Sequence, residues 1–169
     1  DWPKNMDTTK QPFSGDRRKP AGTFDNGATT GELRALARAI GVTGDARYRQ
    51  AFLNGFDHVL TAQYPNGGWP QFYPLSKGYH RHITFNDGSM IRLLQFLRDV
   101  TTKRDFAMLD DDRRTAAARA IQKGIDCIVK CQVVVDGAPT VWCAQHDAET
   151  LVPVQALSYE IPSLSGSES

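Results

Sequence analysis

The sequence has little net charge, few cysteines and no long hydrophobic run. Its formal net charge is +1, so no overall electrostatic field directs the chain toward nucleic acid or an anionic membrane surface. No hydrophobic stretch approaches the roughly 20 residues of a membrane-spanning helix. We therefore expect neither nucleic acid nor a membrane among its partners.

The cysteines do not form a disulfide scaffold. There are three, Cys127, Cys131 and Cys143, and an odd number cannot pair completely within the chain. Cys127 and Cys131 lie four residues apart, on the same face of a predicted helix, and no zinc-binding pattern surrounds them. Because free cysteine is among the most buried residue types, buried thiols are favoured over a metal-binding pair.

The remaining composition is typical of a soluble globular domain. Hydrophobic residues make up 40% and charged residues 23% of the 169 positions, enough for one domain with a core.

Residues 1–22 are polar, contain Pro3, Pro12 and Pro20, and lack periodicity, so we expect an irregular N-terminal segment. The chain begins at Asp1 with neither Met nor a signal-like segment, and we expect it to have been processed or cut.

Apolar residues recur at helical spacing in several segments. The first segment carries Leu33, Leu36 and Ile40 and is ended by Gly41 and Gly44, and Asp45 is a good cap for the second. The predicted helices cover residues 29–40, 45–63, 88–100 and 112–132. A small β-hairpin with an Asp-Gly turn is predicted at residues 133–142. These elements indicate an all-α fold with long loops and one minor hairpin.

An internal repeat groups the helices into hairpins. Residues 55–63 align with residues 124–132, and a turn followed by a tryptophan, Trp69 or Trp142, comes after each copy. Such self-similarity indicates an array of helix hairpins, in which each unit needs neighbours to bury its apolar face. We call the segment before each hairpin its leading loop and the segment after it its trailing loop. Both loops are expected at the same end of the bundle.

Each leading loop ends in a related motif. Thr23-Phe24-Asp25-Asn26-Gly27 precedes the first hairpin, and Thr84-Phe85-Asn86-Asp87-Gly88 precedes the second. Asp and Asn side chains at a helix N-terminus accept hydrogen bonds from the first-turn N–H groups, so two helix caps are one interpretation. The recurrence of the motif at matching places in a longer repeat favours a functional site instead.

The loops at this end are rich in groups that bind sugars. Aromatic rings stack on sugar faces, while amides and imidazoles bind hydroxyls and carboxylates. The predicted substrate-binding residues are Asn26, Trp69, Gln71, Arg81, His82, Trp142, Gln145 and His146. Alternatively, the two tryptophans are buried anchors, and the two histidines are loop struts bonded to the backbone.

Five stretches of the sequence resemble the pectate lyases of polysaccharide lyase family 10. They are residues 25–29, 63–74, 82–88, 142–147 and 159–163, and the run Gln-Tyr-Pro-Asn-Gly-Gly-Trp-Pro-Gln is the most specific part. The resemblance implies an (α/α)3 toroid of three helix pairs, here truncated after two of them. Residues 23–169 are then expected to form the N-terminal two-thirds of a pectate lyase catalytic domain.

The resemblance further implies calcium-dependent cleavage of polygalacturonate or pectin by β-elimination. In this chemistry a base removes the C5 proton of a galacturonate, and a hard cation on the carboxylate stabilises the developing negative charge. Asp25 and Asp87 match the family positions expected to hold Ca²⁺ together with the substrate carboxylate. The family's catalytic arginine lies just before a Tyr-Glu pair, and Leu157 occupies that slot here, so the catalytic base is unassigned.

Two other functions stay open at this stage. Because leucine cannot take a proton, the first is a non-catalytic protein that binds oligogalacturonate or pectin. The second is glycoside hydrolysis with Asp25 and Asp87 as the acid–base pair, which needs carboxylates roughly 6.5–9.5 Å apart for inversion or about 5–5.5 Å for retention. Since the polymer is too large to enter a cell, we expect a secreted protein, and we expect a monomer.

Overall fold

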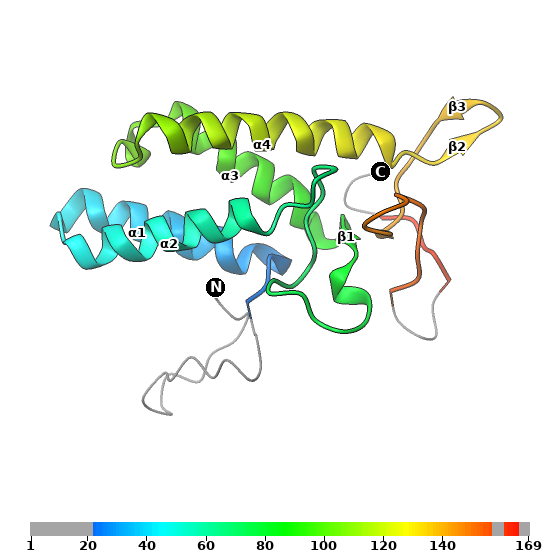
Figure 1. Ribbon diagram of the computed structural model, residues 1–169, viewed down its shortest axis with the longest axis horizontal. Helices are drawn as coiled ribbons and strands as arrows, with labels where there is room; N and C mark the ends of the chain where they lie inside the picture. Colours follow the sequence, from blue (N-terminus) through cyan, green and yellow to red (C-terminus); the bar gives the residue numbers. More distant parts are fainter. Residues whose placement is uncertain (1–21, 157–160, 166–169) are drawn as a thin grey trace.

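A computed structural model describes residues 22–156 and 161–165 of the protein. In this part, two antiparallel α-hairpins lie side by side, and helices dominate the fold (Figure 1). The hairpins consist of α1 (Ala28–Thr43) with α2 (Ala46–Thr61), and of α3 (Ser89–Thr102) with α4 (Asp111–Lys130). They meet through contacts of α1 with α3 and of α2 with α4. The predicted all-α class and the four predicted helices are confirmed.

Local sequence signals explain where the helices begin and end. Gly44 ends α1 with a left-handed φ of 66°, which glycine adopts without steric cost. Asp45 Oδ1 then accepts a hydrogen bond of 2.8 Å from Arg47 N and caps α2. Asp110 Oδ1 accepts a bond of 2.8 Å from Arg113 N at the start of α4. The chain therefore reverses direction between α1 and α2 within a few residues.

Two short antiparallel strand pairs lie outside the helices. β2 (Val134–Val135) pairs with β3 (Ala138–Pro139) across the turn Asp136–Gly137, where both residues have positive φ. This is the predicted hairpin, although its second strand begins earlier than the expected Thr140. β1 (Ile83–Thr84) pairs with β4 (Gln145–His146), which the sequence did not predict because two residues are too few to show alternation.

The core between the hairpins contains a cluster of phenylalanines. Phe52 and Phe56 come from α2, Phe96 from α3 and Phe106 from η4 (Arg104–Phe106). Their ring centroids lie 5.9–6.5 Å apart, in stacked, tilted and edge-to-face arrangements. Each fully buried phenylalanine contributes roughly 1.5–3 kcal/mol through apolar burial. The cluster therefore joins one hairpin firmly to the other.

The three cysteines are buried free thiols, as predicted for Cys127 and Cys131. Cys127 lies on the inner face of α4 and Cys131 is the C-cap of this helix, with their Sγ atoms 4.0 Å apart, and Cys143 is buried in the second trailing loop. Their positions in the interior agree with a packing role.

The internal repeat is also visible in side-chain contacts. Trp69 Nε1 donates to Val59 O at 2.8 Å, and Trp142 Nε1 donates to Ile128 O at 2.7 Å. Val59 and Ile128 occupy the same position in the two copies of the repeat. Each tryptophan thus ties its trailing loop to the last turns of its own hairpin.

Some predictions fall outside the described residues. These include most of the irregular segment 1–22 and the Leu157 slot, so the proposed domain boundaries stay predictions. Within the described part, none of the helices is long and apolar enough to cross a membrane.

Candidate functional site

The leading and trailing loops meet at one end of the bundle, as the repeat predicted. Phe24 N donates to Gln71 O at 2.9 Å, which joins the loops on either side of the first hairpin. Phe85 N donates to Ala144 O at 2.9 Å and joins those of the second. β1 pairs with β4 and also bridges to Pro70 of the first trailing loop. The three segments before α1, between α2 and α3, and after α4 therefore form one continuous hydrogen-bonded strip.

The two motifs at the ends of the leading loops have the same backbone conformation. Asn26 has φ 51° and ψ 23°, and Asp87 has φ 57° and ψ 26°, both left-handed. Gly27 and Gly88 follow with φ of 72° and 68°. Asn and Asp tolerate this region better than other non-glycine residues, which explains part of the shared motif. The conformation alone does not require that either position carry a charge.

The carboxylates of these motifs do not cap the helices that follow. In the part of the chain that the structure describes, no first-turn N–H of α1 or α3 donates to Asp25 or Asp87. Instead, Asn26 Nδ2 donates to Asp25 Oδ1 at 3.0 Å, and Asn86 Nδ2 donates to Asp87 Oδ2 at 2.9 Å. The interpretation of the motifs as helix caps is therefore wrong, because the left-handed turn separates the side chains from the first-turn amides.

The two motifs lie against each other at this end of the bundle. η1 (Asp25–Gly27) contacts η3 (Asn86–Gly88), with Asp25 only 8% exposed and Asp87 at the surface. Carboxylate and amide oxygens are the ligands that Ca²⁺ prefers, and it takes six to eight of them. Among the described residues, no group of three or more His, Cys, Asp and Glu side chains forms a complete metal site. The carboxylate and amide oxygens of the two motifs are of the chemical type that suits Ca²⁺.

An aromatic stack lies in the first trailing loop. The His80 ring lies between Phe72 and Tyr79, with centroid distances of 4.2 and 3.9 Å. Burial lowers the pKa of His80, and the negative charge of Asp25 opposes that shift. The stack therefore lies within electrostatic reach of the first motif and keeps its imidazole mainly neutral.

Three predicted substrate-binding residues lie inside the protein. Trp69, Gln145 and His146 are at most 2% exposed. Besides the Trp69 bond described above, Gln145 Nε2 donates to Thr84 Oγ1 at 3.2 Å, and His146 Nδ1 lies 2.9 Å from Leu151 O. These buried side chains hold the loops together from the interior of the protein. Direct sugar contact would require the core to open, so we leave them out of the proposed contact surface.

The other five predicted substrate-binding residues reach the surface to different degrees. Asn26 and Arg81 are exposed, whereas Gln71, His82 and Trp142 are half-buried. Gln71 Oε1 and His82 Nδ1 are buried atoms without a hydrogen-bond partner among the described residues. Trp142 is anchored through its indole N–H, like its counterpart in the first repeat.

The His146-Asp147 pair acts as part of a turn. Asp147 Oδ1 accepts hydrogen bonds from the N–H groups of Thr150 and Glu149, and these bonds lower the pKa of the Asp147 carboxyl. Burial lowers the pKa of His82, and the charge of Asp147 opposes this shift. The pair therefore shapes the second trailing loop.

Arg92 is a residue at this site that motif analysis missed. It projects from the first turns of α3 across Gly27 and Gly88, the glycines of the two motifs. Its only sequence signal is its position four residues after Gly88, where the first repeat has Gly31 after Gly27. A difference between two repeats is not recognisable as functional until the side chain's neighbours are known.

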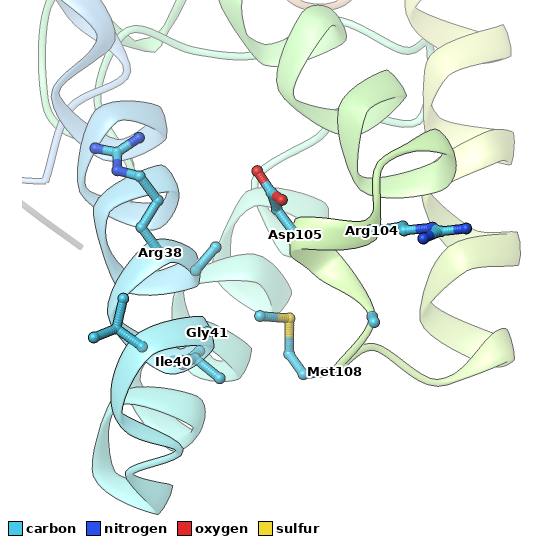
Figure 2. Close-up of a pocket in the computed structure, with 9 residues that line it drawn as sticks. Arg38, Ile40, Gly41, Arg104, Asp105 and Met108 are labelled. Atoms are coloured by element: carbon cyan, nitrogen blue, oxygen red, sulfur yellow. The ribbon is translucent and has the colours of Figure 1, made fainter.

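A pocket of about 500 Å³ lies away from these loops. It is formed by the C-terminal end of α1 and by the segment around η4, whereas the motifs precede the N-terminus of α1. Figure 2 shows Ile40 and Met108 on its walls and Arg38 and Asp105 at its rim, with Arg104 directed away. The pocket is mainly apolar and contains none of the predicted site residues.

Comparisons with known proteins are consistent with this picture. The family model described as "Pectic acid lyase" matches residues 1–169. A solved structure of a family 10 polysaccharide lyase from Cellvibrio cellulosa is 42% identical, with a TM-score of 0.87, and the match covers 99% of this chain and 53% of that one. A mutant of a family 10 polysaccharide lyase from Cellvibrio cellulosa, in complex with trigalacturonic acid, gives the same identity, TM-score and coverage. The chain thus spans about half the length of these solved relatives. A comparison with curated proteins finds no match.

Proposed function

The chain belongs to the pectic acid lyase family, and we propose on that premise that it acts as a calcium-dependent pectate lyase on polygalacturonate. Cleavage would proceed by β-elimination, in which the C5 proton is removed and the C4–oxygen bond breaks. The electron pair of the C5–H bond then becomes the C4–C5 double bond. The observation that supports this proposal best is the pair of adjacent Asp/Asn motifs whose carboxylates are not helix caps.

In this proposal Asp25 and Asp87 hold Ca²⁺ together with a galacturonate carboxylate. The ion supplies positive charge where negative charge develops next to C5. Asn26 and Asn86 orient the two carboxylates through the hydrogen bonds described above. The identity of the base is left open, because the Leu157 slot lies outside the described residues.

The proposal is tested by following the ultraviolet absorbance of the unsaturated product. The complete protein is incubated with polygalacturonate at neutral to alkaline pH, with Ca²⁺ or with a chelator. We expect absorbance to rise only with Ca²⁺. Failure to release the conjugated product at any pH with Ca²⁺ present would exclude the lyase activity.

A pair of aspartate variants separates a role in the reaction from a role in folding. Asp87→Asn keeps the side chain's shape and its tolerance of positive φ, and we expect it to lower turnover on the order of a hundredfold or more with little change in stability. Asp45→Ala removes a true helix cap, so it should cost about 1 kcal/mol of stability and leave turnover unchanged. Equal turnover in the wild type and Asp87→Asn would remove Asp87 from the site.

A second candidate function is calcium-dependent binding of oligogalacturonate without catalysis. The specific observation in its favour is Leu157, which stands where the family's base is expected and cannot accept a proton. Calorimetry that detects trigalacturonate binding, with no chromophore after long incubation, would favour this function. Both candidates act on an extracellular polymer, so we propose a secreted protein, and its presence in the culture medium of the producing organism is the test.

A further inference from the structure

The side chain of Arg92 spans the two Asp/Asn motifs. A Cβ atom built at Gly27 would lie 3.4 Å from Arg92 Nη1, and one built at Gly88 would lie 3.4 Å from Arg92 Nε. The guanidinium therefore lies directly over both glycines, although these are 61 positions apart in the sequence. It places a positive charge between the loops that we propose to hold calcium.

This guanidinium has no acidic partner among the described residues. Arg34 pairs with Asp99 at 2.6 Å, and Arg113 pairs with Asp57 at 2.7 Å, whereas Arg92 makes no ion pair or hydrogen bond there. Its side chain is exposed. A guanidinium presents several N–H donors in a planar fork that matches a carboxylate. The donors of Arg92 are thus available to an anion from outside the chain.

The second repeat has an arginine at this position and the first repeat does not. The first repeat has Gly31 where the second has Arg92, and a Cβ at Gly31 would meet nothing within 4 Å. The first motif therefore has no arginine of its own, and the side chain from α3 covers the glycines of both. One cation is shared by two motifs that each carry one carboxylate.

We propose that Arg92 binds a carboxylate of the oligogalacturonate next to the one that Asp25 and Asp87 hold through calcium. This inference rests on the proposed function and extends it with a residue that selects for uronate over neutral sugar. Neighbouring uronates in the polymer each carry a negative charge. Calcium and Arg92 would therefore each bind one carboxylate of two successive units. An esterified or neutral chain lacks these charges and should bind more weakly.

A purely structural role for Arg92 makes a different prediction. In that case the aliphatic stem would matter, because it packs on Gly27 and Gly88, and the charge would not. Arg92→Met keeps an unbranched apolar stem and removes the charge. Arg92→Lys keeps the charge and loses the fork. Arg98→Gln changes an exposed arginine of the same helix and serves as the control for net charge.

The experiment measures trigalacturonate binding to the complete protein by calorimetry at saturating Ca²⁺, with thermal unfolding of each variant alongside. We expect Arg92→Met to weaken binding roughly ten- to a hundredfold, Arg92→Lys to recover part of the loss, and Arg98→Gln to match the wild type. Fully methyl-esterified trigalacturonate should bind wild type and Arg92→Met equally weakly.

The outcomes distinguish this inference from the proposed function. If the wild type binds trigalacturonate and folded Arg92→Met binds it equally well, the role of Arg92 is packing and the inference is overturned. If the wild type itself does not bind trigalacturonate with Ca²⁺, the proposed function fails and the inference fails with it.

Discussion

At the scale of single residues, His58 shows how a half-buried group packs behind the first motif. Its ring lies 6.0 Å from Phe24, which precedes Asp25, and 5.2 Å from Tyr73. Its Nε2 atom has no hydrogen-bond partner within the described part of the chain. Burial lowers the pKa of His58 from 6.5 to about 4. The packing behind the first motif therefore favours the neutral form of the His58 imidazole.

This shift predicts a pH dependence of stability. The unfolded chain binds a proton at His58 more readily than the folded one, so this residue's contribution to stability is present above pH 6.5 and is lost as the pH falls toward 4. Urea unfolding between pH 7 and pH 5 should show decreasing stability, with a smaller slope in His58→Gln. Some slope should remain, since burial also lowers the pKa of His80, His82 and His146. An unchanged slope in the variant would contradict the assignment.

At the scale of elements, the turn after α2 explains the most specific run of the sequence. A Cβ atom at Gly67 would lie 2.0 Å from Lys123 O of α4, and one at Gly68 would lie 2.5 Å from the Ile83 side chain. Asn66 Nδ2 donates to Ala148 O at 2.7 Å and links this turn to the second trailing loop. The Asn-Gly-Gly segment therefore joins the two hairpins at the end of the bundle that holds the site.

Glycine variants test this role of the turn. Gly67→Ala should lower stability by about 2–4 kcal/mol, because its φ of +97° disfavours a side chain and its Cβ would displace α4. Gly41→Ala is the matched control within α1, where a Cβ meets nothing within 4 Å, and it should raise stability by roughly 0.5–1 kcal/mol. Urea denaturation measures both changes. A similar effect of the two substitutions would mean that the turn can move away from α4.

At the scale of the whole molecule, the two ends of the bundle have different properties. One end carries the hydrogen-bonded strip of loops with two carboxylates, a shared arginine and an aromatic stack. The other carries the mainly apolar pocket beside η4 (Figure 2). Sugars need hydroxyl- and carboxylate-binding groups, and these gather at the loop end.

This difference between the two ends predicts that substitutions at the pocket leave sugar binding intact. Arg38→Ala and Arg104→Ala each remove a positive charge beside the pocket, and each should change trigalacturonate affinity by less than about twofold, because distant sites act independently. Calorimetry under the conditions used for Arg92 provides the comparison. Lost affinity in either variant would place the sugar at the pocket instead of the loops.

The sequence by itself determined the helices, their pairing and the end at which the loops meet. Apolar spacing, the caps at Asp45 and Asp110 and the alignment of two copies are local signals, and local hydrogen bonds enforce them. The motifs at Asp25 and Asp87 were recognisable because Thr-Phe, one Asp, one Asn and Gly recur before each hairpin, with the Asp and Asn in opposite order. The cap interpretation of these motifs failed because a left-handed turn is not visible in residue type alone.

Only the tertiary structure decided which polar and aromatic residues of the loops face outward. Trp69 and His146 have residue types that suit a sugar site, yet burial between the hairpins makes them part of the scaffold. Arg92 has an ordinary helical position, yet the approach of two distant glycines places its guanidinium over both Asp/Asn motifs. Exposure and proximity arise from packing among segments far apart in the chain, and a linear pattern does not contain those distances.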